Sequence, residues 1–249
     1  IGFGPYSSTV MSGGNELLEV ELDSSLIFQE NYCIHFYLNH VTYNLSCAST
    51  SAISVYLSND TCQYSSVNWS APPFIPQLTN DSGNYIIDTL NWHELKWMYN
   101  STGGEKFITI GNFNSPATNS LYSYDACTGG SSTQAPYYFI DDVSVIKLPK
   151  LEAGRDTTII SSETATLNGN ITETWPGMQF EWLPHTGLSN PYSLTPVAFP
   201  NTTTTYTLTV SCPTCNVPCL EDLRDTATIT VNAVPPPPPA IFNIPALIV

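Results

Sequence analysis

The stretch Glu16-Leu-Leu-Glu-Val-Glu-Leu22 decides the fold class. Leu18, Val20 and Leu22 lie two residues apart, and the positions between them are glutamates. Because successive side chains of a β-strand point to opposite faces, this period of two places the apolar residues on a buried face and the charges in solvent. The pattern predicts a half-buried β-strand.

The same alternation recurs along the first part of the chain, whereas helical periodicity is almost absent. It is found in residues 34–38, 53–57, 95–99, 107–110 and 137–148. Clusters of Gly, Pro, Asn and Ser, such as the turn at Gly103-Gly104, divide these segments. Short strands separated by turn residues are typical of a sandwich or barrel. We therefore predict an all-β chain whose first domain covers residues 1–149.

The chain from Lys150 onward has a different composition. Threonine alternates with Leu, Trp, Val or Ile in residues 164–167, 179–182, 205–210 and 226–231. Short strands of this kind are typical of a compact immunoglobulin-like β-sandwich, which we assign to residues 150–234.

Residues 235–249 form a third segment. Pro235–Pro239 predict a stiff polyproline spacer of roughly 15 Å. The spacer leads into Ile241–Val249, which is nearly all apolar and β-prone. An exposed strand of this kind aggregates unless something covers it. We expect it to find its partner outside its own two domains.

Charge restricts the classes of partner. The chain has 6 Lys and Arg against 21 Asp and Glu, a formal net charge of −15, and no Lys or Arg precedes Lys96. Such a chain is poorly suited to neutralise phosphates, which argues against nucleic acid and anionic membranes. Its apolar runs are only of strand length, so no membrane span is expected.

Seven cysteines and many Asn-x-Ser/Thr sequences favour an oxidising, extracellular setting. The sequence starts at Ile1 with no signal-like segment, so we expect a processed region of a secreted protein.

Several motifs resemble secreted surface proteins of gliding Bacteroidota. In the first domain they are Glu16–Leu22, Tyr32-Cys-Ile-His-Phe-Tyr37, Thr102-Gly-Gly-Glu-Lys-Phe-Ile-Thr-Ile-Gly-Asn-Phe113 and Tyr138-Phe-Ile-Asp-Asp-Val-Ser-Val145. In the second domain they are Ala153-Gly-Arg-Asp-Thr-Thr158, Trp182-Leu-Pro-His-Thr-Gly-Leu-Ser-Asn-Pro191 and Pro200-Asn-Thr-Thr-Thr-Thr-Tyr-Thr-Leu-Thr-Val210.

The resemblance implies a galactose-binding-like jelly roll followed by an immunoglobulin/PKD-like repeat. Ile241–Val249 is similar to the opening of the gliding-associated C-terminal domain used for type IX secretion and surface attachment. Family jelly rolls usually carry an extra first strand, with an Asn-Pro and Phe-Glu signature, ahead of the region that matches Ile1–Leu22, and no such signature stands in this sequence. We therefore expect the first domain to lack its opening strand.

No catalytic motif is found, and we predict that the protein is not an enzyme. His93-Glu94 matches half of a zinc-protease motif, but Trp97 stands where the second histidine belongs, in a segment with β alternation. There is neither a Gly-x-Ser-x-Gly elbow nor a phosphate-binding glycine loop.

Asp141 and Asp142 are the candidate ion ligands. Adjacent strand residues point to opposite faces, so one of them would bind Ca²⁺ with loop carbonyls, since Ca²⁺ takes six to eight oxygens. Related jelly rolls often hold a structural calcium near this strand, and we expect no other cofactor. In the alternative, one of the aspartates accepts backbone hydrogen bonds at a strand end.

The cysteines allow several pairings. Cys212, Cys215 and Cys219 have zinc-like spacing but no convincing fourth ligand, so we prefer a Cys212–Cys219 disulfide. Four cysteines in the first domain permit three pairings, of which we favour Cys62–Cys127.

Two further features concern glycans. Four aromatic residues are either a sugar-stacking platform or ordinary core and rim residues: Trp69, Trp92, Tyr122 and Tyr124. Three Asp-Thr-hydrophobic triads match the O-glycosylation pattern of Bacteroidota or arise by chance in a Thr-rich chain, with acceptors Thr89, Thr157 and Thr226.

These observations favour a non-catalytic extracellular structural protein of the cell surface. We expect a filament or surface-layer subunit that donates its final strand to a neighbouring copy, giving a head-to-tail homopolymer. The side chains that would be buried are Ile241, Phe242, Ile244, Leu247 and Ile248. Pro245 blocks one hydrogen bond, which an edge or bulge accommodates. The alternatives are an adhesin or carbohydrate-binding module of a larger protein, and an accessory domain of a hydrolase.

Overall fold

The computed structural model describes residues 7–9, 17–41, 48–62, 73–114, 121–123 and 136–234. These residues form β-strands and no α-helix, so the prediction of an all-β fold is confirmed. The chain divides into two compact units. Unit 1 contains residues 1–149 and Val217–Leu220, and unit 2 contains residues 150–216 and 221–249.

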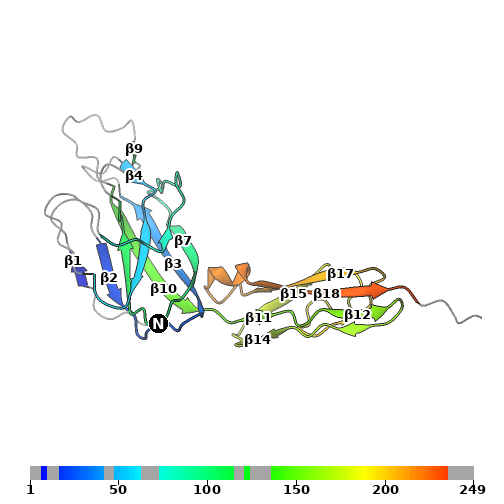
Figure 1. The fold of residues 1–249 in the computed structure, drawn as a ribbon. Helices are drawn as coiled ribbons and strands as arrows, with labels where there is room; N and C mark the ends of the chain where they lie inside the picture. Colours follow the sequence, from blue (N-terminus) through cyan, green and yellow to red (C-terminus); the bar gives the residue numbers. More distant parts are fainter. Residues whose placement is uncertain are drawn as a thin grey trace, which may run out of the picture. The chain divides into compact units, whose positions relative to one another are not determined.

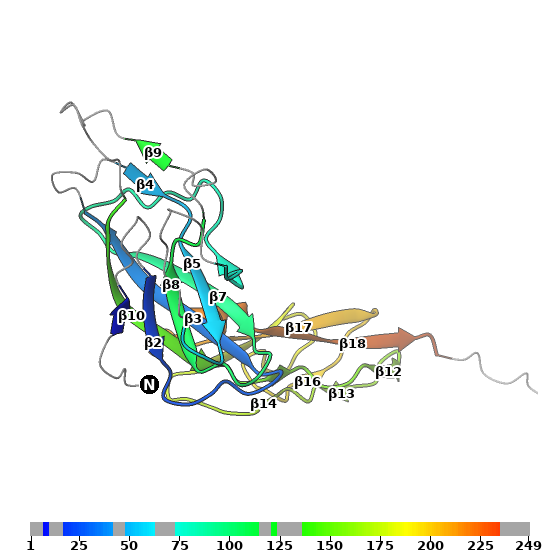
Figure 2. The same ribbon diagram turned by 60° about the vertical axis from the view of Figure 1, so that its left-hand side comes forward.

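Unit 1 is built from two main sheets. The first has five strands in the order β1 (Ser7–Thr9), β2 (Leu17–Glu21), β8 (Phe107–Gly111), β5 (Ser54–Ser58) and β6 (Leu78–Thr79). The second has three strands in the order β10 (Tyr138–Lys147), β3 (Asn31–His40) and β7 (His93–Asn100), which follow one another across Figure 2. A short pair, β4 (Ala48–Thr50) and β9 (Leu121–Ser123), lies at one end of the unit (Figure 1).

The core of unit 1 lies between these sheets. One hydrophobic cluster joins Val20, Val55 and Ile108 of the five-stranded sheet to Ile34 and Phe36 of the three-stranded sheet. Since both sheets contribute to the same core, unit 1 is a sandwich. Its alternation agrees with the period-two pattern of the sequence, because the apolar residues predicted to point inward are buried or half-buried.

The five-stranded sheet has a strand ahead of β2. Residues 7–9 form β1, which pairs antiparallel with β2 from Ser7↔Glu19 to Thr9↔Leu17. β1 lies within Ile1–Leu22 and so is not the family strand expected ahead of that region, and the lack of an opening strand remains a prediction. The sheet with fewer strands is the one that contains β10, β3 and β7.

Four residues from the second half of the sequence belong to unit 1. The chain leaves unit 1 after Pro149 and returns for Val217–Leu220, where the short 3-10 helix η1 (Pro218–Asp222) begins. Lys96 Nζ donates a hydrogen bond to the Pro218 carbonyl at 3.1 Å, and Cys219 is disulfide-bonded to Cys33 of β3. A covalent bond therefore fixes this return segment to the three-stranded sheet.

Unit 2 has one larger sheet and two short strand pairs. The larger sheet has the order β12 (Thr157–Ile160), β18 (Arg224–Asn232), β17 (Thr204–Ser211) and β15 (Gln179–Leu183), with β12 parallel to β18. The pairs are β11 (Leu151–Glu152) with β14 (Asn170–Ile171) and β13 (Ala165–Thr166) with β16 (Val197–Ala198).

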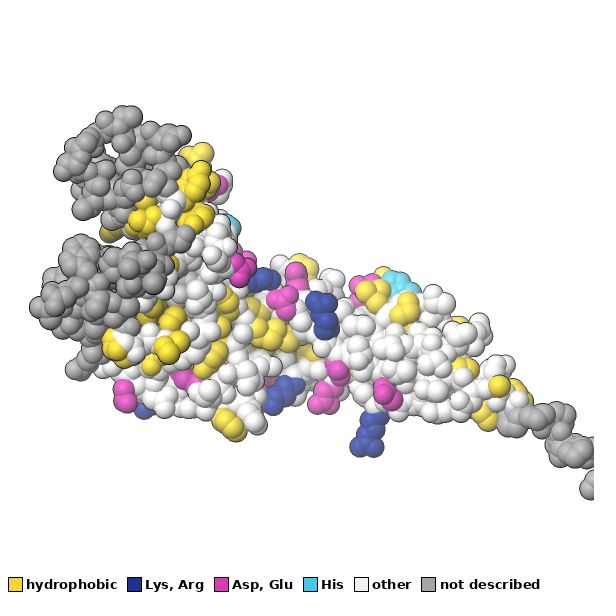
Figure 3. All heavy atoms as spheres, turned by 45° about the horizontal axis from the view of Figure 1, so that its top comes forward, with side chains coloured by type: hydrophobic (Ala, Val, Ile, Leu, Met, Phe, Trp, Pro, Cys, Tyr) yellow, Lys and Arg dark blue, Asp and Glu magenta, His cyan; other side chains and the backbone are white. Residues whose placement is uncertain are grey.

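The interior of unit 2 centres on Trp182 and Tyr206, neither of which is exposed. Trp182 Nε1 donates to the Ser193 carbonyl at 2.9 Å and the Tyr206 hydroxyl to the Thr186 carbonyl at 2.9 Å, so both buried polar groups are satisfied. Threonines alternate with buried residues along β17 and β18, as predicted. The face of unit 2 visible in Figure 3 accordingly has few hydrophobic side chains, unlike that of unit 1.

The jelly-roll and immunoglobulin-like arrangements remain predictions within the confirmed all-β class. None of the helices in the described part of the chain is long and apolar enough to cross a membrane.

Candidate functional site

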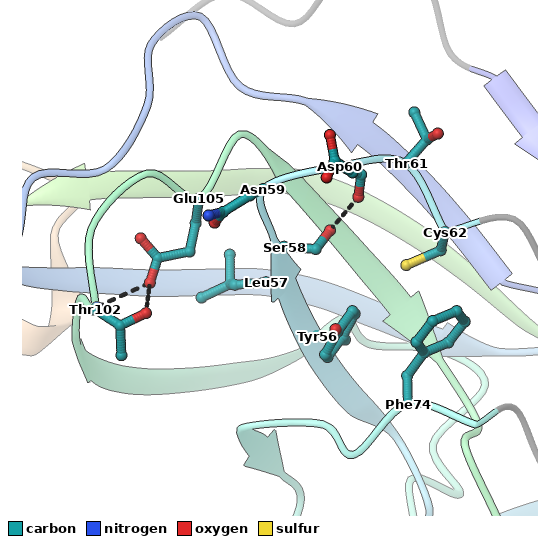
Figure 4. Close-up of a pocket in the computed structure, with 10 residues that line it drawn as sticks. All are labelled: Tyr56, Leu57, Ser58, Asn59, Asp60, Thr61, Cys62, Phe74, Thr102 and Glu105. Carbon is teal, nitrogen blue, oxygen red and sulfur yellow. Dashed lines mark hydrogen bonds between the residues drawn. The ribbon is translucent and has the colours of Figure 1, made fainter.

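A pocket of about 340 Å³ opens beside β5 in unit 1 (Figure 4). One wall comes from Tyr56 at the solvent side of β5 and from Phe74. The remaining wall comes from the residues that follow β5 and from the turn between β7 and β8. The full lining is Tyr56, Leu57, Ser58, Asn59, Asp60, Thr61, Cys62, Phe74, Thr102 and Glu105.

The loop after β5 is held by short-range hydrogen bonds. Ser58 Oγ donates to the Asp60 carbonyl at 2.7 Å, which closes a turn directly after the strand. Asn59 lies beside Gly104, whose φ of +95° requires glycine. A Cβ on Gly104 would also lie 3.3 Å from Asn59 Nδ2. The turn therefore leaves the Asn59 and Asp60 side chains exposed at the pocket.

The apolar wall is a pair of stacked rings. The ring centroids of Tyr56 and Phe74 are 5.3 Å apart at an interplanar angle of 28°. Gln77 fixes the segment that carries Phe74, because its amide accepts from the Leu57 N–H at 2.8 Å and donates to the Leu57 carbonyl at 2.9 Å. A side chain thus replaces a strand partner and sets the aromatic pair in place.

Glu105 forms the inner end of the pocket and is only 2% exposed. Its carboxylate accepts hydrogen bonds from the Tyr99 and Ser101 hydroxyls and from both the N–H and the hydroxyl of Thr102, all at 2.7–2.8 Å. Burial alone raises the pKa of Glu105, but the hydrogen bonds from Ser101, Thr102 and Tyr99 outweigh it and lower this pKa to about 2. Glu105 is therefore an ionised structural group and a poor general acid at neutral pH.

The pocket ends at the free thiol of Cys62. Glu19 Oε2 accepts from the Cys62 N–H at 2.7 Å and from Thr109 Oγ1 at 3.1 Å, and Thr109 Oγ1 lies 3.4 Å from Cys62 Sγ. Burial raises the pKa of the Cys62 thiol, the hydrogen bond from Thr109 partly opposes this effect, and the hydrogen bond and charge of Glu19 raise the pKa further. Because the thiolate is the nucleophile, this environment makes Cys62 unreactive.

The lining can bind but has no assembled catalytic pair. Exposed amide, carboxyl and hydroxyl groups stand next to an aromatic wall, which is the combination that holds a neutral polyol by hydrogen bonds and ring stacking. No sequence prediction pointed to this pocket. The Ser58-Asn-Asp60 turn was a local signal for it, whereas nothing near Phe74 indicates that its ring meets Tyr56.

Asp141 and Asp142 lie at a β-bulge in β10, where the pairing with β3 shifts between Asp141 and Ser144. Asp142 has a φ of +51°, and its N–H donates to Asp141 Oδ1 at 2.8 Å. The described residues contain no cluster of three or more His, Cys, Asp or Glu side chains that could hold a metal ion. One aspartate thus accepts a backbone hydrogen bond, as the alternative to calcium required, and calcium binding remains a prediction.

His35 lies on the outer face of the same sheet and is not exposed at all. Its Nδ1 is 3.4 Å from Glu94 Oε1. Burial lowers the pKa of His35, and the charges of Glu94 and Asp142 partly oppose this effect. The imidazole of His35 is therefore neutral at neutral pH.

The predicted disulfides are wrong. Cys219 pairs with Cys33 and Cys212 with Cys215, so Cys212 and Cys219 are not joined. The physical reason is that Val217–Leu220 folds onto unit 1, which carries Cys219 away from Cys212 and to β3. Cys62 is a free thiol, which contradicts the Cys62–Cys127 pair. Cys47 and Cys127 lie outside the described residues.

The four predicted platform aromatics are not brought together in the described structure. Trp92 and Tyr122 are exposed, and Tyr122 packs on Tyr85 with ring centroids 5.6 Å apart. Trp69 and Tyr124 lie outside the described residues, as do the five assembly residues Ile241, Phe242, Ile244, Leu247 and Ile248.

The three predicted glycan acceptors, Thr89, Thr157 and Thr226, are all exposed. The aspartates that precede them also have structural roles. The N–H of Leu90 donates to Asp88, that of Thr228 to Asp156 and that of Ala153 to Asp225. The aspartate of each triad thus accepts a backbone hydrogen bond in a turn or beside a strand, and glycosylation of the threonines remains a prediction.

The fold and the pocket define an all-β protein with two compact units and a polar, aromatic-walled pocket in the first. No protein-family model matches the chain, and no curated protein matches its sequence.

Proposed function

We propose that this chain is a non-catalytic structural protein of the cell surface whose copies assemble by strand donation. Residues Ile241–Val249 of one copy add a strand to a sheet of the next, and the contact is head-to-tail, so it yields a filament unless a ring closes. An extracellular location suits the two disulfides among the described residues.

One observation carries the proposal. Tyr138, Ile140 and Val143 of β10 point toward the core of unit 1 but are only partly buried. Ile34 and Phe36, which face the same core from the neighbouring strand, are not exposed at all. The border of the sandwich at β10 therefore leaves apolar surface that an added strand would cover.

Removing residues 235–249 should convert the assembled protein to monomers. The reason is that the donated strand supplies both backbone hydrogen bonds and apolar surface. Size-exclusion chromatography with light scattering measures the change. Ile244→Lys should act like the deletion, whereas Asn243→Lys, a matched control, adds the same charge on the other face of the strand and should leave assembly intact. Polymers that persist after the deletion reject strand donation.

A second function, recognition of a neutral glycan, is favoured by the pocket of unit 1. Its ring pair offers a stacking surface, and Asn59 and Asp60 offer exposed hydrogen-bonding groups. This would make the chain an adhesin or carbohydrate-binding module, with or without assembly.

Tyr56→Ala should weaken glycan binding by roughly 2- to 12-fold, because stacking on an aromatic ring contributes about 0.5–1.5 kcal/mol. A glycan array identifies the ligand, and calorimetry on wild type and variant measures the loss. Tyr122→Ala removes an exposed ring outside the pocket and should leave binding unchanged. If neither protein binds any glycan on the array, this second function is rejected.

A further inference from the structure

β10 is the open edge of the three-stranded sheet. It pairs with β3 on one side, and no described strand pairs with it on the other. An edge of ten residues presents backbone N–H and C=O groups that another chain can use. The opposite border of the sandwich differs, because Trp97 Nε1 of β7 donates to the Thr79 carbonyl of β6 at 3.3 Å and so bridges the two sheets.

The bulge divides this edge into two equal stretches. Tyr138–Asp141 pair in register with His40 to Tyr37, and Ser144–Lys147 pair with His35 to Tyr32. Asp142 and Val143 lie between the two stretches, and both are opposite a single residue of β3, Phe36. The Asp142 N–H is already bonded to Asp141 Oδ1. The ladder is therefore interrupted at its centre, with four paired residues on each side.

Pro245 interrupts the apolar segment of the sequence at its centre. Ile241–Ile244 and Ala246–Val249 are four residues each, and they flank Pro245. Proline has no N–H to give to a ladder, so within a sheet it is tolerated at edges and bulges. In the first stretch Phe242 and Ile244 share one face and Asn243 the other, which matches a strand with one face on a core.

Charge also favours this segment. The chain has a net charge of −15, and β10 carries two exposed carboxylates at the bulge. Residues 235–249 contain no charged side chain. Such a segment lies against Asp141 and Asp142 without the repulsion that most of this acidic chain would meet.

We propose that Ile241–Val249 of a second copy pairs in parallel with the open edge of β10, with Ile244 opposite the bulge at Asp142–Val143 and Pro245 directly after it. The inference rests on the strand-donation function and adds the acceptor strand and its register. Phe242 and Ile244 would cover the exposed parts of Ile140 and Val143.

A pair of matched charge variants in the full chain tests the acceptor. Val143→Glu and Leu78→Glu each place a carboxylate at a half-buried position against the core of unit 1, the first on β10 and the second on β6. Assembly measured by light scattering should be lost in V143E and kept in L78E, with circular dichroism checking the fold of both. Polymers of V143E that still disappear on deletion of residues 235–249 overturn the β10 acceptor but leave strand donation standing. Polymers that survive the deletion reject both.

Discussion

Replacing Glu105 by glutamine should lower the free energy of unfolding of unit 1 by about 3 kcal/mol at neutral pH. Four donors converge on this buried carboxylate, from Tyr99, Ser101 and twice from Thr102. An amide offers one acceptor oxygen and turns its NH₂ group toward donors. Because hydrogen bonds to a charged group are the strong ones, the variant loses more than a neutral pair would.

The same substitution should remove part of the acid sensitivity of the protein. The pKa of Glu105 is about 2 in the folded state, against an ordinary value of 4.5. A carboxyl with a depressed folded-state pKa contributes stability fully above the unfolded value and loses it as the pH falls through the folded value. The window is therefore from about pH 4.5 down to about pH 2, and the contribution that fades across it is about 3 kcal/mol. About 2 kcal/mol of it is gone by about pH 3.

Urea unfolding at neutral pH and near pH 3 measures both effects, with hydrogen exchange of residues 93–111 assigning them to unit 1. The difference in the free energy of unfolding between wild type and E105Q should become smaller as the pH falls. Glu21→Gln is the matched control, since Glu21 is exposed on β2 of the same unit and should change stability very little. If this difference does not change with pH, the pKa of Glu105 is not depressed in the folded state. If the difference at neutral pH is below about 1 kcal/mol, the four hydrogen bonds to Glu105 do not stabilise the fold as expected.

The features that follow from local periodicity were predictable. The alternation of Ile34, Phe36 and Leu38 fixes which face of β3 meets the core, because strand geometry couples neighbouring residues directly. The threonine alternation of β17 and β18 was read correctly for the same reason. Gly103 and Gly104 mark a turn, and both have positive φ. In each case the information lies within a few consecutive residues.

Some of the hydrogen bonds to Glu105 could also have been predicted from the sequence. Ser101, Thr102 and Glu105 lie within five residues around the Gly-Gly turn, so a turn with its own carboxylate acceptor could have been proposed. Tyr99 adds a fourth hydrogen bond from the strand before it. What no local pattern shows is that this carboxylate is buried, since burial depends on how distant strands pack over the turn.

The prediction of the disulfide pairing was wrong because the pairing depends on a long-range contact. The spacing of Cys212, Cys215 and Cys219 suggests a local staple, and nothing near Cys219 indicates that Val217–Leu220 leaves unit 2. The stacking of Tyr56 on Phe74 is of the same kind, because the two rings come from separate segments. Contacts between surfaces that have no periodic pattern were therefore the ones missed.

Removing the disulfide between Cys33 and Cys219 should be the most destabilising covalent change in the described part of the chain. Its two residues are separated by 186 positions. In the chain-entropy model, opening a loop of this length costs about 5 kcal/mol, because the unfolded chain regains the freedom that the bridge removed. Cys33→Ala with Cys219→Ala makes this change without burying a hydroxyl, which matters since both residues are almost fully buried.

Cys212→Ala with Cys215→Ala is the matched control. That bridge spans only 3 positions, for which the same model gives about 2 kcal/mol. Calorimetry should therefore show a much larger drop in the melting temperature for the first double variant than for the second. Hydrogen exchange should rise at Val217–Leu220 and β3 in the first alone, because the bridge fixes the return segment to the sheet. Equal losses in the two double variants would mean that loop length does not set the contribution of these bridges, and unchanged exchange at Val217–Leu220 would mean that the segment stays on β3 without its covalent bond.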